Sequence, residues 1–135
     1  MPDTTQQTRT TVQQFFQALA ARDLGGIGGL LAEEVDWEVP GNQELAPWLG
    51  KRRTRQDVLA SLDLLWQRAQ PVRGEMEHLL VEGDFAVVTG EFASRMLPTG
   101  KLYESLFSAH FTVVDGLIVR YRLQEDSYGL VVALS

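Results

Sequence analysis

Residues 102–122, LYESLFSAHFTVVDGLIVRYR, contain two stretches of alternating side chains on either side of Asp115-Gly116. From 105 to 113 every second residue is small or apolar, as in a strand with one buried face. An Asp-Gly pair between two such stretches is a strong signal for a β-hairpin. The segment therefore predicts strands at about 101–114 and 117–124. In the second strand, the alternation sets Leu117, Val119, Tyr121 and Leu123 opposite Ile118, Arg120 and Arg122.

Three more strands are expected upstream of this hairpin. The period of two continues over about 72–82 and 85–96, with turns at 82–84 and 97–100. The stretch VDWEV, 35–39, alternates strictly and ends at Pro40-Gly41, after which 42–53 is expected to be a loop. The alternation puts Asp36 and Glu38 on a solvated face, and Glu33 and Glu34 are expected to close the preceding helix, so these four carboxylates are not expected to form a catalytic cluster. The opposite, inner face of this strand carries Val35, Trp37 and Val39.

Helical periodicity appears in three places before residue 70. Apolar residues recur at helical spacing over 8–21 and again over about 55–69. Between them Asp23 can cap a short helix that runs to Leu31, although four glycines weaken it. Helices followed by an antiparallel meander indicate an α+β fold. We expect a cone-shaped fold in which three N-terminal helices pack on a curved, mainly antiparallel sheet and leave a hollow between them.

Length and composition indicate one soluble domain over residues 1–135, with 1–7 flexible. The chain has 135 residues, 44% of them hydrophobic, which suits a single core of ordinary size. No apolar run approaches the roughly 18 residues of a membrane span, and the first ten residues do not resemble a secretory signal. The expected location is therefore the cytoplasm, without membrane contact.

Charge and residue usage argue against several classes of site. With no cysteine and only two histidines, a metal site is not expected. The net charge of −6 disfavours nucleic acid as a partner, because binding to phosphates depends on Lys and Arg. The basic run KRRTR, 51–55, is interpreted as a solvated loop.

Two longer segments resemble a known superfamily. AARDLGGIGGLLAEEVDWEVPG, 20–41, is similar to the ketosteroid isomerases from the first helix to the first strand. LPTGKLYESLFSAHFTVVDGLIVRYR, 97–122, is similar to the hairpin of limonene epoxide hydrolase. Together they resemble the nuclear transport factor 2-like superfamily, and in particular its SnoaL-like, ketosteroid isomerase-related members. These motifs specify a fold much more strongly than an activity.

The resemblance does not carry over the known catalytic residues. The isomerases use an aspartate base with a tyrosine and a second acid, and the matching positions here are Val39, Phe15 and Ala109. The epoxide hydrolase uses an arginine and two aspartates, and the matching positions are Gly90, Phe92 and Leu123. Neither known reaction is therefore predicted from these positions.

The inner face of the fold is expected to be aromatic and suited to a small hydrophobic, cyclic molecule. His78 is a candidate general base if its side chain faces the hollow, because its ordinary pKa suits proton transfer near neutrality. Glu125 is the second catalytic candidate, because an apolar pocket raises the pKa of a carboxyl group. The expected ligand-binding residues are Phe15, Leu19, Trp37, Val39, Trp48, Leu62, Trp66, Val88, Phe92, Ser105, Phe107, Tyr121 and Leu123.

Three possibilities remain open at this point. One is an isomerase, cyclase or hydrolase that needs no cofactor, and another is a dimeric binding or carrier module without catalysis. The third is a structural dimer whose core is filled. The resemblance implies a homodimer through the convex sheet face, with Leu106 and Ile118 among the interface residues. On that face Glu91, Glu104, His110, Arg120 and Arg122 are expected to pair across strands, and Arg122 and Asp126 are interpreted as a structural ion pair.

Overall fold

A single six-stranded sheet organises the computed structural model, which describes residues 3–135. The strand order is β2-β1-β6-β5-β4-β3, and all neighbours are antiparallel except β1 and β6, which run parallel. The strands are β1 (Leu31–Val39), β2 (Gly50–Thr54), β3 (Ala69–Glu82), β4 (Phe85–Met96), β5 (Leu102–Val114) and β6 (Leu117–Glu125).

Four helices accompany the sheet: α1 (Thr4–Ala20), α2 (Leu24–Gly28), α3 (Arg55–Arg68) and α4 (Ser127–Ala133). Three helices were expected; α3 follows β1 and β2 in the chain, and the C-terminal α4 was not anticipated. Of the predicted flexible stretch 1–7, residues 1–2 lie outside the described part, and the chain from Thr4 onward forms the first turn of α1, capped by Asp3. None of the helices within 3–135 has the length and apolar character needed to cross a bilayer.

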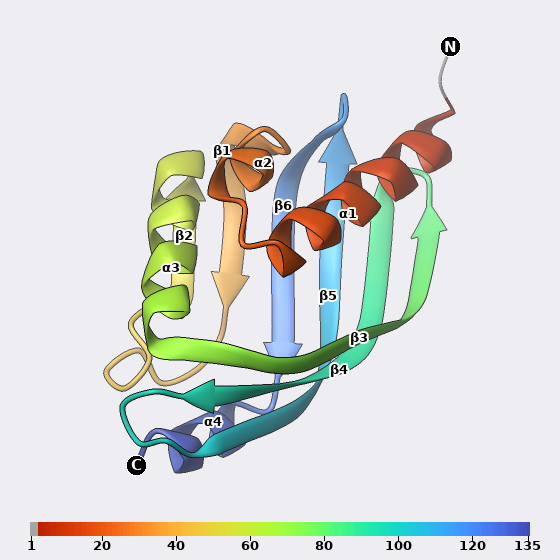
Figure 1. The fold of residues 1–135 in the computed structure, drawn as a ribbon. Helices are drawn as coiled ribbons and strands as arrows, with labels where there is room; N and C mark the ends of the chain where they lie inside the picture. The colour runs from red at the N-terminus through yellow and green to blue at the C-terminus, as the bar shows by residue number, and fades with distance from the viewer. Residues whose placement is uncertain (1–2) are drawn as a thin grey trace.

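The sheet is strongly curved, and its concave side faces the helices. In Figure 1, α1 lies across the strands near one end of the sheet, and α3 stands beside β1 and β2. The long strand β3 begins at the foot of α3, passes in front of the sheet and then turns along β4, while α4 lies near the opposite end from the N-terminus. The register of β3 shifts at Pro71/Arg73 and at Met76/His78, within this bend. β-Bulges generally bend the strand that contains the extra residue.

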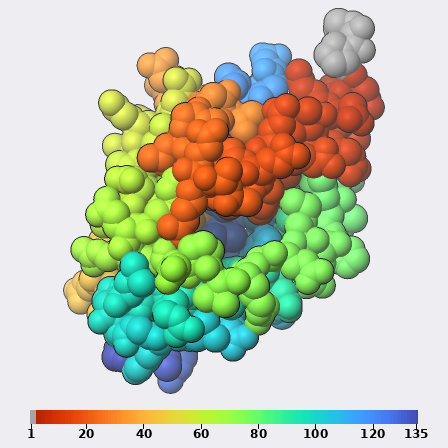
Figure 2. All heavy atoms as spheres, in the orientation of Figure 1, coloured from red at the N-terminus to blue at the C-terminus, as the bar shows by residue number. Residues whose placement is uncertain are grey.

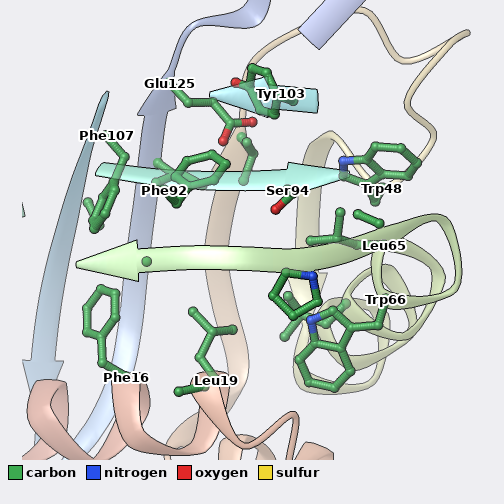
Figure 3. Close-up of a pocket in the computed structure, with 18 of the residues that line it drawn as sticks. Phe16, Leu19, Trp48, Leu65, Trp66, Phe92, Ser94, Tyr103, Phe107 and Glu125 are labelled. Carbon is green, nitrogen blue, oxygen red and sulfur yellow. The ribbon is translucent and has the colours of Figure 1, made fainter. Parts of the chain in front are cut away.

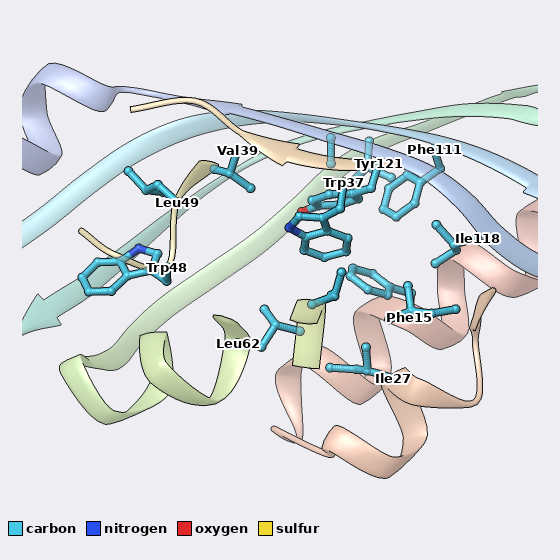
Figure 4. Close-up of a cluster of buried hydrophobic side chains, with 14 of the residues drawn as sticks. Phe15, Ile27, Trp37, Val39, Trp48, Leu49, Leu62, Phe111, Ile118 and Tyr121 are labelled. Atoms are coloured by element: carbon cyan, nitrogen blue, oxygen red, sulfur yellow. The ribbon is translucent and has the colours of Figure 1, made fainter. Parts of the chain in front are cut away.

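Aromatic rings form the centre of the core (Figure 4). Trp37 and Tyr121 stack with their centroids 3.9 Å apart, and the Phe15 ring meets the Phe111 ring edge to face at 5.4 Å. Phe15 is fully buried, and its ring is also within 6.3 Å of Trp37. One residue of α1 thus connects the helix to the inner faces of β1, β5 and β6.

Two expectations about the first strand are wrong in detail. Glu33 and Glu34 lie within β1 rather than at a helix end, because the strand begins at Leu31. The expected loop 42–53 contains β2, whose residues Gly50–Thr54 pair with β1. A short, highly charged edge strand lacks apolar alternation, so the sequence pattern does not reveal it.

Ile118 is not on the convex face, where the sequence pattern placed it. Its side chain is 0% exposed and belongs to the core. The reason is a register shift: Val113 pairs with Ile118, but Thr112 pairs with Arg120, so Val119 is an extra residue. A bulge of this kind reverses which side chains point inward on either side of it.

Candidate functional site

A cavity of about 560 Å³ lies between the concave sheet face, α1, α3 and the first half of β3. Figure 2 shows the hollow opening between α1 and the start of β3, with atoms of the C-terminal segment visible inside it. Ligand sites typically have volumes of roughly 300–1,000 Å³. The hollow is therefore large enough for a small organic molecule.

The cavity wall is mainly aromatic and aliphatic, and it comes from distant parts of the chain. Inward-facing positions of the sheet supply one side, and α1 and α3 supply the other, so the wall is assembled only when the sheet curves. Most of the residues expected from the sequence meet here: Phe15, Leu19, Trp37, Val39, Trp48, Leu62, Trp66, Phe92, Phe107, Tyr121 and Leu123.

Val88 and Ser105 were also expected, but they do not line the cavity. Val88 is fully buried in the core. The Ser105 hydroxyl donates a hydrogen bond to the Leu106 carbonyl and accepts one from the Asp126 amide. The Ser105 side chain therefore binds backbone groups outside the cavity.

His78 lies outside the cavity. It pairs with Thr89, whose neighbour in β5 is Ser108 on the convex face, and its side chain is exposed. The bulge at Met76/His78 changes the direction of the side chains at this point of β3. His78 is a candidate base only if its side chain faces the hollow. The side chain does not face it.

Glu125 does reach the cavity. It is the last residue of β6, its side chain lines the hollow, and none of the hydrogen bonds within 3–135 involves its carboxyl group. Figure 3 shows the carboxyl pointing among Tyr103, Phe92 and the neighbouring side chains. Burial, with a smaller contribution from the adjacent Asp126 charge, raises the Glu125 pKa from 4.5 to about 7. Near neutral pH this group can both give and take a proton.

Two side chains of β5 hold the backbone amide and the backbone carbonyl of Asp126, the residue that follows Glu125. The Ser105 hydroxyl accepts from the Asp126 amide at 2.9 Å, and the Tyr103 hydroxyl donates to the Asp126 carbonyl at 2.9 Å. The Asp126 carboxylate caps α4 by accepting from the Gly129 amide. These bonds fix where β6 ends and so fix where the Glu125 side chain begins.

The Tyr121 hydroxyl is a second polar group of the wall. It has no hydrogen-bond partner within 3–135, yet it is not sealed off, since no fully buried polar side-chain atom of the described residues lacks a partner. Burial and the nearby Glu125 charge raise its pKa above the ordinary value of 10. It therefore stays protonated and can donate a hydrogen bond to a ligand.

Tyr103, Ser94 and Arg22 also line the cavity, although they are not among the residues expected from the sequence. Tyr103 lies two residues before Ser105 and Ser94 two residues after Phe92, so a longer alternating pattern would have found both. Arg22 follows α1 in a turn, and no sequence pattern points to it.

Asp36 and Glu38 of β1 lie on the convex side, as expected. The Arg122 guanidinium donates to both oxygens of Asp36 at 2.9 and 3.0 Å, and this contact lowers the Asp36 pKa. Arg122 also lies 3.6 Å from Glu38. Arg122 thus pairs with β1, whereas the predicted pair with Asp126 does not form among these residues.

Other charges of the convex face also pair, but through Arg73, which is not among the residues expected there from the sequence. The Arg73 guanidinium donates to Glu91 and to Glu104. Nowhere in 3–135 do three or more acidic or histidine side chains come together in a way that could hold a metal ion.

Gly90 has a steric role in the site. A side chain at this position would collide with the Glu75 carbonyl oxygen and would lie 2.8 Å from the Phe107 ring. The close approach of β3 to β4 therefore requires glycine here. A polar catalytic side chain cannot occupy this position without moving β3.

Comparison with known proteins gives a family and a fold. The sequence pattern of the SnoaL-like domain matches residues 12–121. No curated protein sequence matches the chain. Among solved structures, an NTF2-like protein from Burkholderia xenovorans LB400 is 24% identical with a TM-score of 0.87, over 97% of this chain and 98% of that one.

Two similar structures come from proteins described as enzymes. An LEH-like epoxide hydrolase from M. tuberculosis is 18% identical with a TM-score of 0.76, over 96% of this chain and 90% of that one. A ketosteroid isomerase candidate from Kribbella flavida DSM 17836 is 23% identical with a TM-score of 0.65, over 90% and 79%. At these identities the likeness shows the NTF2-like fold.

Proposed function

The chain belongs to the SnoaL-like domain family, and from this premise we propose that its cavity binds a small hydrophobic, ring-containing molecule and transfers a proton on it. The observation that carries the proposal is the Glu125 carboxyl group, which lies unpaired in an apolar wall with a pKa of about 7. General acids and bases work best when their pKa lies near the working pH. The aromatic side chains that line the hollow suit a flat apolar ligand.

Glu125 and Tyr121 would have different roles in this proton transfer. The Glu125 carboxylate takes a proton from a carbon next to a carbonyl group, and the Tyr121 hydroxyl donates a hydrogen bond to the carbonyl oxygen on which negative charge develops. Return of the same proton to another carbon completes an isomerisation. In a ring closure, the enolate carbon attacks a second carbonyl carbon of the same molecule, the π electrons of that carbonyl move to its oxygen, and the proton returns to this oxygen. No other reactant is consumed in this sequence.

Hydrolysis is a weaker candidate for this cavity. It needs a positioned and activated water, and the positions that match the epoxide hydrolase residues carry Gly90, Phe92 and Leu123. None of these offers a side-chain hydrogen bond. Proton relocation on the substrate is therefore the reaction that we assign.

Proton abstraction can be tested without knowing the product. A panel of small cyclic ketones is incubated with the protein in D₂O, and exchange of hydrogen for deuterium beside the carbonyl is followed by NMR. We expect the native protein to accelerate exchange for at least one ketone and Glu125→Gln to reduce the rate by about 10²–10⁴-fold. Equal exchange rates in both proteins would exclude Glu125 as the base.

A non-catalytic carrier is the second candidate, because Phe15, Val39 and Ala109 leave the usual isomerase positions apolar. A carrier should bind a cyclic apolar probe tightly and should not accelerate hydrogen–deuterium exchange in any ketone. Trp37→Ala should then weaken probe binding, since Trp37 forms part of the aromatic wall.

We also propose that two copies associate through the convex face of the sheet. Leu106 and Leu80 are 71% and 65% exposed there, and a second copy would remove these apolar side chains from water. Leu106→Glu should shift a dimer to monomer in sedimentation equilibrium. Leu45→Glu, in the loop after β1, serves as the control and should not, and a monomeric native protein would contradict the proposal.

A further inference from the structure

We propose that the ligand of this cavity is an amphipathic anion, whose apolar rings fill the hollow and whose carboxylate or similar acidic group binds Arg22 at the mouth. This inference rests on the proposed function, since it names the class of molecule that the same cavity holds. The proposal starts from Arg22, a cation that lines a mainly apolar cavity between α1 and the junction of α3 with β3.

The Arg22 side chain is fixed in place by the α3–β3 junction. Its guanidinium donates to the Trp66 carbonyl at 3.2 Å and to the Ala69 carbonyl at 2.8 Å, and it lies over the Trp66 ring at 5.6 Å. The Arg22 backbone has a φ of 52°, a left-handed conformation that is costly for a residue with a side chain. Arg22 is therefore held against Trp66 at some conformational cost.

Arg22 is also the cavity cation without an acidic partner. The other arginine of the lining, Arg73, binds Glu91 and Glu104. No carboxylate within 3–135 lies within ion-pair distance of Arg22, and burial lowers its pKa. In a chain of net charge −6, a partly buried guanidinium without a counter-ion favours an external anion.

The guanidinium keeps enough donors for such an anion. It has five N–H groups, of which the two carbonyl bonds use two and leave three. Carboxylates and related anions are the natural partners of this planar group, and charge-assisted hydrogen bonds are about twice as strong as neutral ones. The Trp66 ring behind the guanidinium gives the apolar part of the ligand a surface beside its charged end.

The cavity separates this charge from Glu125. Figure 3 shows Trp66 and Leu19 on one side of β3, and Glu125 and Tyr103 on the other. An anion bound beside Trp66 would therefore lie away from the Glu125 carboxyl, and the aromatic side chains of the lining would surround the rest of the ligand. Arg22 would orient the molecule so that its uncharged end reaches Glu125.

Two fluorescent probes with the same ring system test the assignment. 8-Anilinonaphthalene-1-sulfonate carries an anionic group, and N-phenyl-1-naphthylamine is the same skeleton without it. Both are titrated into the native protein, Arg22→Gln and the control Arg68→Gln, which removes an exposed cation from the last turn of α3. We expect Arg22→Gln to weaken binding of the sulfonate at least about tenfold and to change binding of the amine by less than about twofold.

The outcomes separate the inference from the proposed function. If Arg22→Gln weakens both probes equally, Arg22 only supports the wall, and the anion assignment is overturned while the cavity remains a ligand site. If the sulfonate is unaffected by Arg22→Gln, the assignment is also overturned. If neither probe binds the native protein, the proposed ligand cavity itself fails.

The control Arg68→Gln should bind both probes as tightly as the native protein does. If Arg68→Gln weakens sulfonate binding as much as Arg22→Gln does, the effect comes from the general loss of positive charge, and the assignment is also overturned.

Discussion

The contribution of Glu125 to the free energy of unfolding should fall by about 3 kcal/mol between pH 4.5 and about pH 7, and Glu125→Gln should remove this fall. The size of this fall follows from the Glu125 pKa, which rises from 4.5 to about 7 on folding. Each pKa unit corresponds to about 1.4 kcal/mol. Glutamine has nearly the same shape and no charge. The variant should therefore match the native protein near pH 4 and be more stable than it near pH 8.

The sign follows from proton binding in the two states. Below pH 4.5 the carboxyl group is neutral in both states, and its stabilising effect is fully present. Between pH 4.5 and 7 the unfolded chain has lost the proton while the folded protein retains it, so rising pH favours the unfolded state. Above about pH 7 the folded protein holds an ionised carboxylate in an apolar wall, and the stability contribution is lost.

Urea unfolding at several pH values measures this difference. Glu77→Gln, in the exposed part of β3, is the control and should keep the native pH dependence. Parallel curves for the native protein and Glu125→Gln across pH 4–8 would show that Glu125 has an ordinary environment. Asp126→Asn is the finer test, because asparagine keeps the helix cap but removes the neighbouring charge, so the fall should end at a lower pH and be smaller.

Phe15→Ala should lower the free energy of unfolding by about 3–5 kcal/mol. The Phe15 ring is fully buried and contacts the rings of Phe16, Trp37, Phe111 and Tyr121, so its removal leaves a void where α1 meets the sheet. With a total stability of about 5–15 kcal/mol for an ordinary domain, this is a large fraction. Urea unfolding followed by tryptophan fluorescence measures the loss.

Phe16→Ala provides a matched control one residue further along α1. Phe16 is only partly buried and lines the cavity, so its removal should cost roughly 1–2 kcal/mol and enlarge the hollow. Equal losses for the two variants would contradict the division between core and cavity wall described above.

The alternating pattern predicted most of the cavity wall from the sequence. Trp37 and Val39 face inward and Asp36 and Glu38 outward, because a strand side chain has only two directions and the apolar set must be buried. Glu125 was a candidate because it extends the inward series of Tyr121 and Leu123 in β6.

Bulges explain why the pattern placed Ile118 wrongly and left the direction of His78 open. Each residue lies next to a register shift, and across an extra residue the inward and outward positions exchange. Alternation within one strand cannot reveal a bulge, because the shift is defined by the partner strand. Only the paired sheet shows that Ile118 is buried and His78 exposed.

Two elements lacked a usable sequence signal. The charged strand β2 is defined by its pairing with β1, not by apolar residues. The helix α4 has seven residues, too short for a clear helical period, and its cap Asp126 had been interpreted as an ion-pair partner. Arg22 was also missed, since its contacts with Trp66 and Ala69 join segments more than forty residues apart.

The carboxyl carbon of Glu125 gives the most direct measurement of the central claim. Protein labelled with ¹³C at glutamate side chains is titrated by NMR, and the Glu125 signal is assigned by its absence in Glu125→Gln. We predict a midpoint near pH 7, set by burial in the cavity wall. A midpoint near 4.5, the ordinary value for glutamate, would contradict the claim that Glu125 is the acid and base of this cavity.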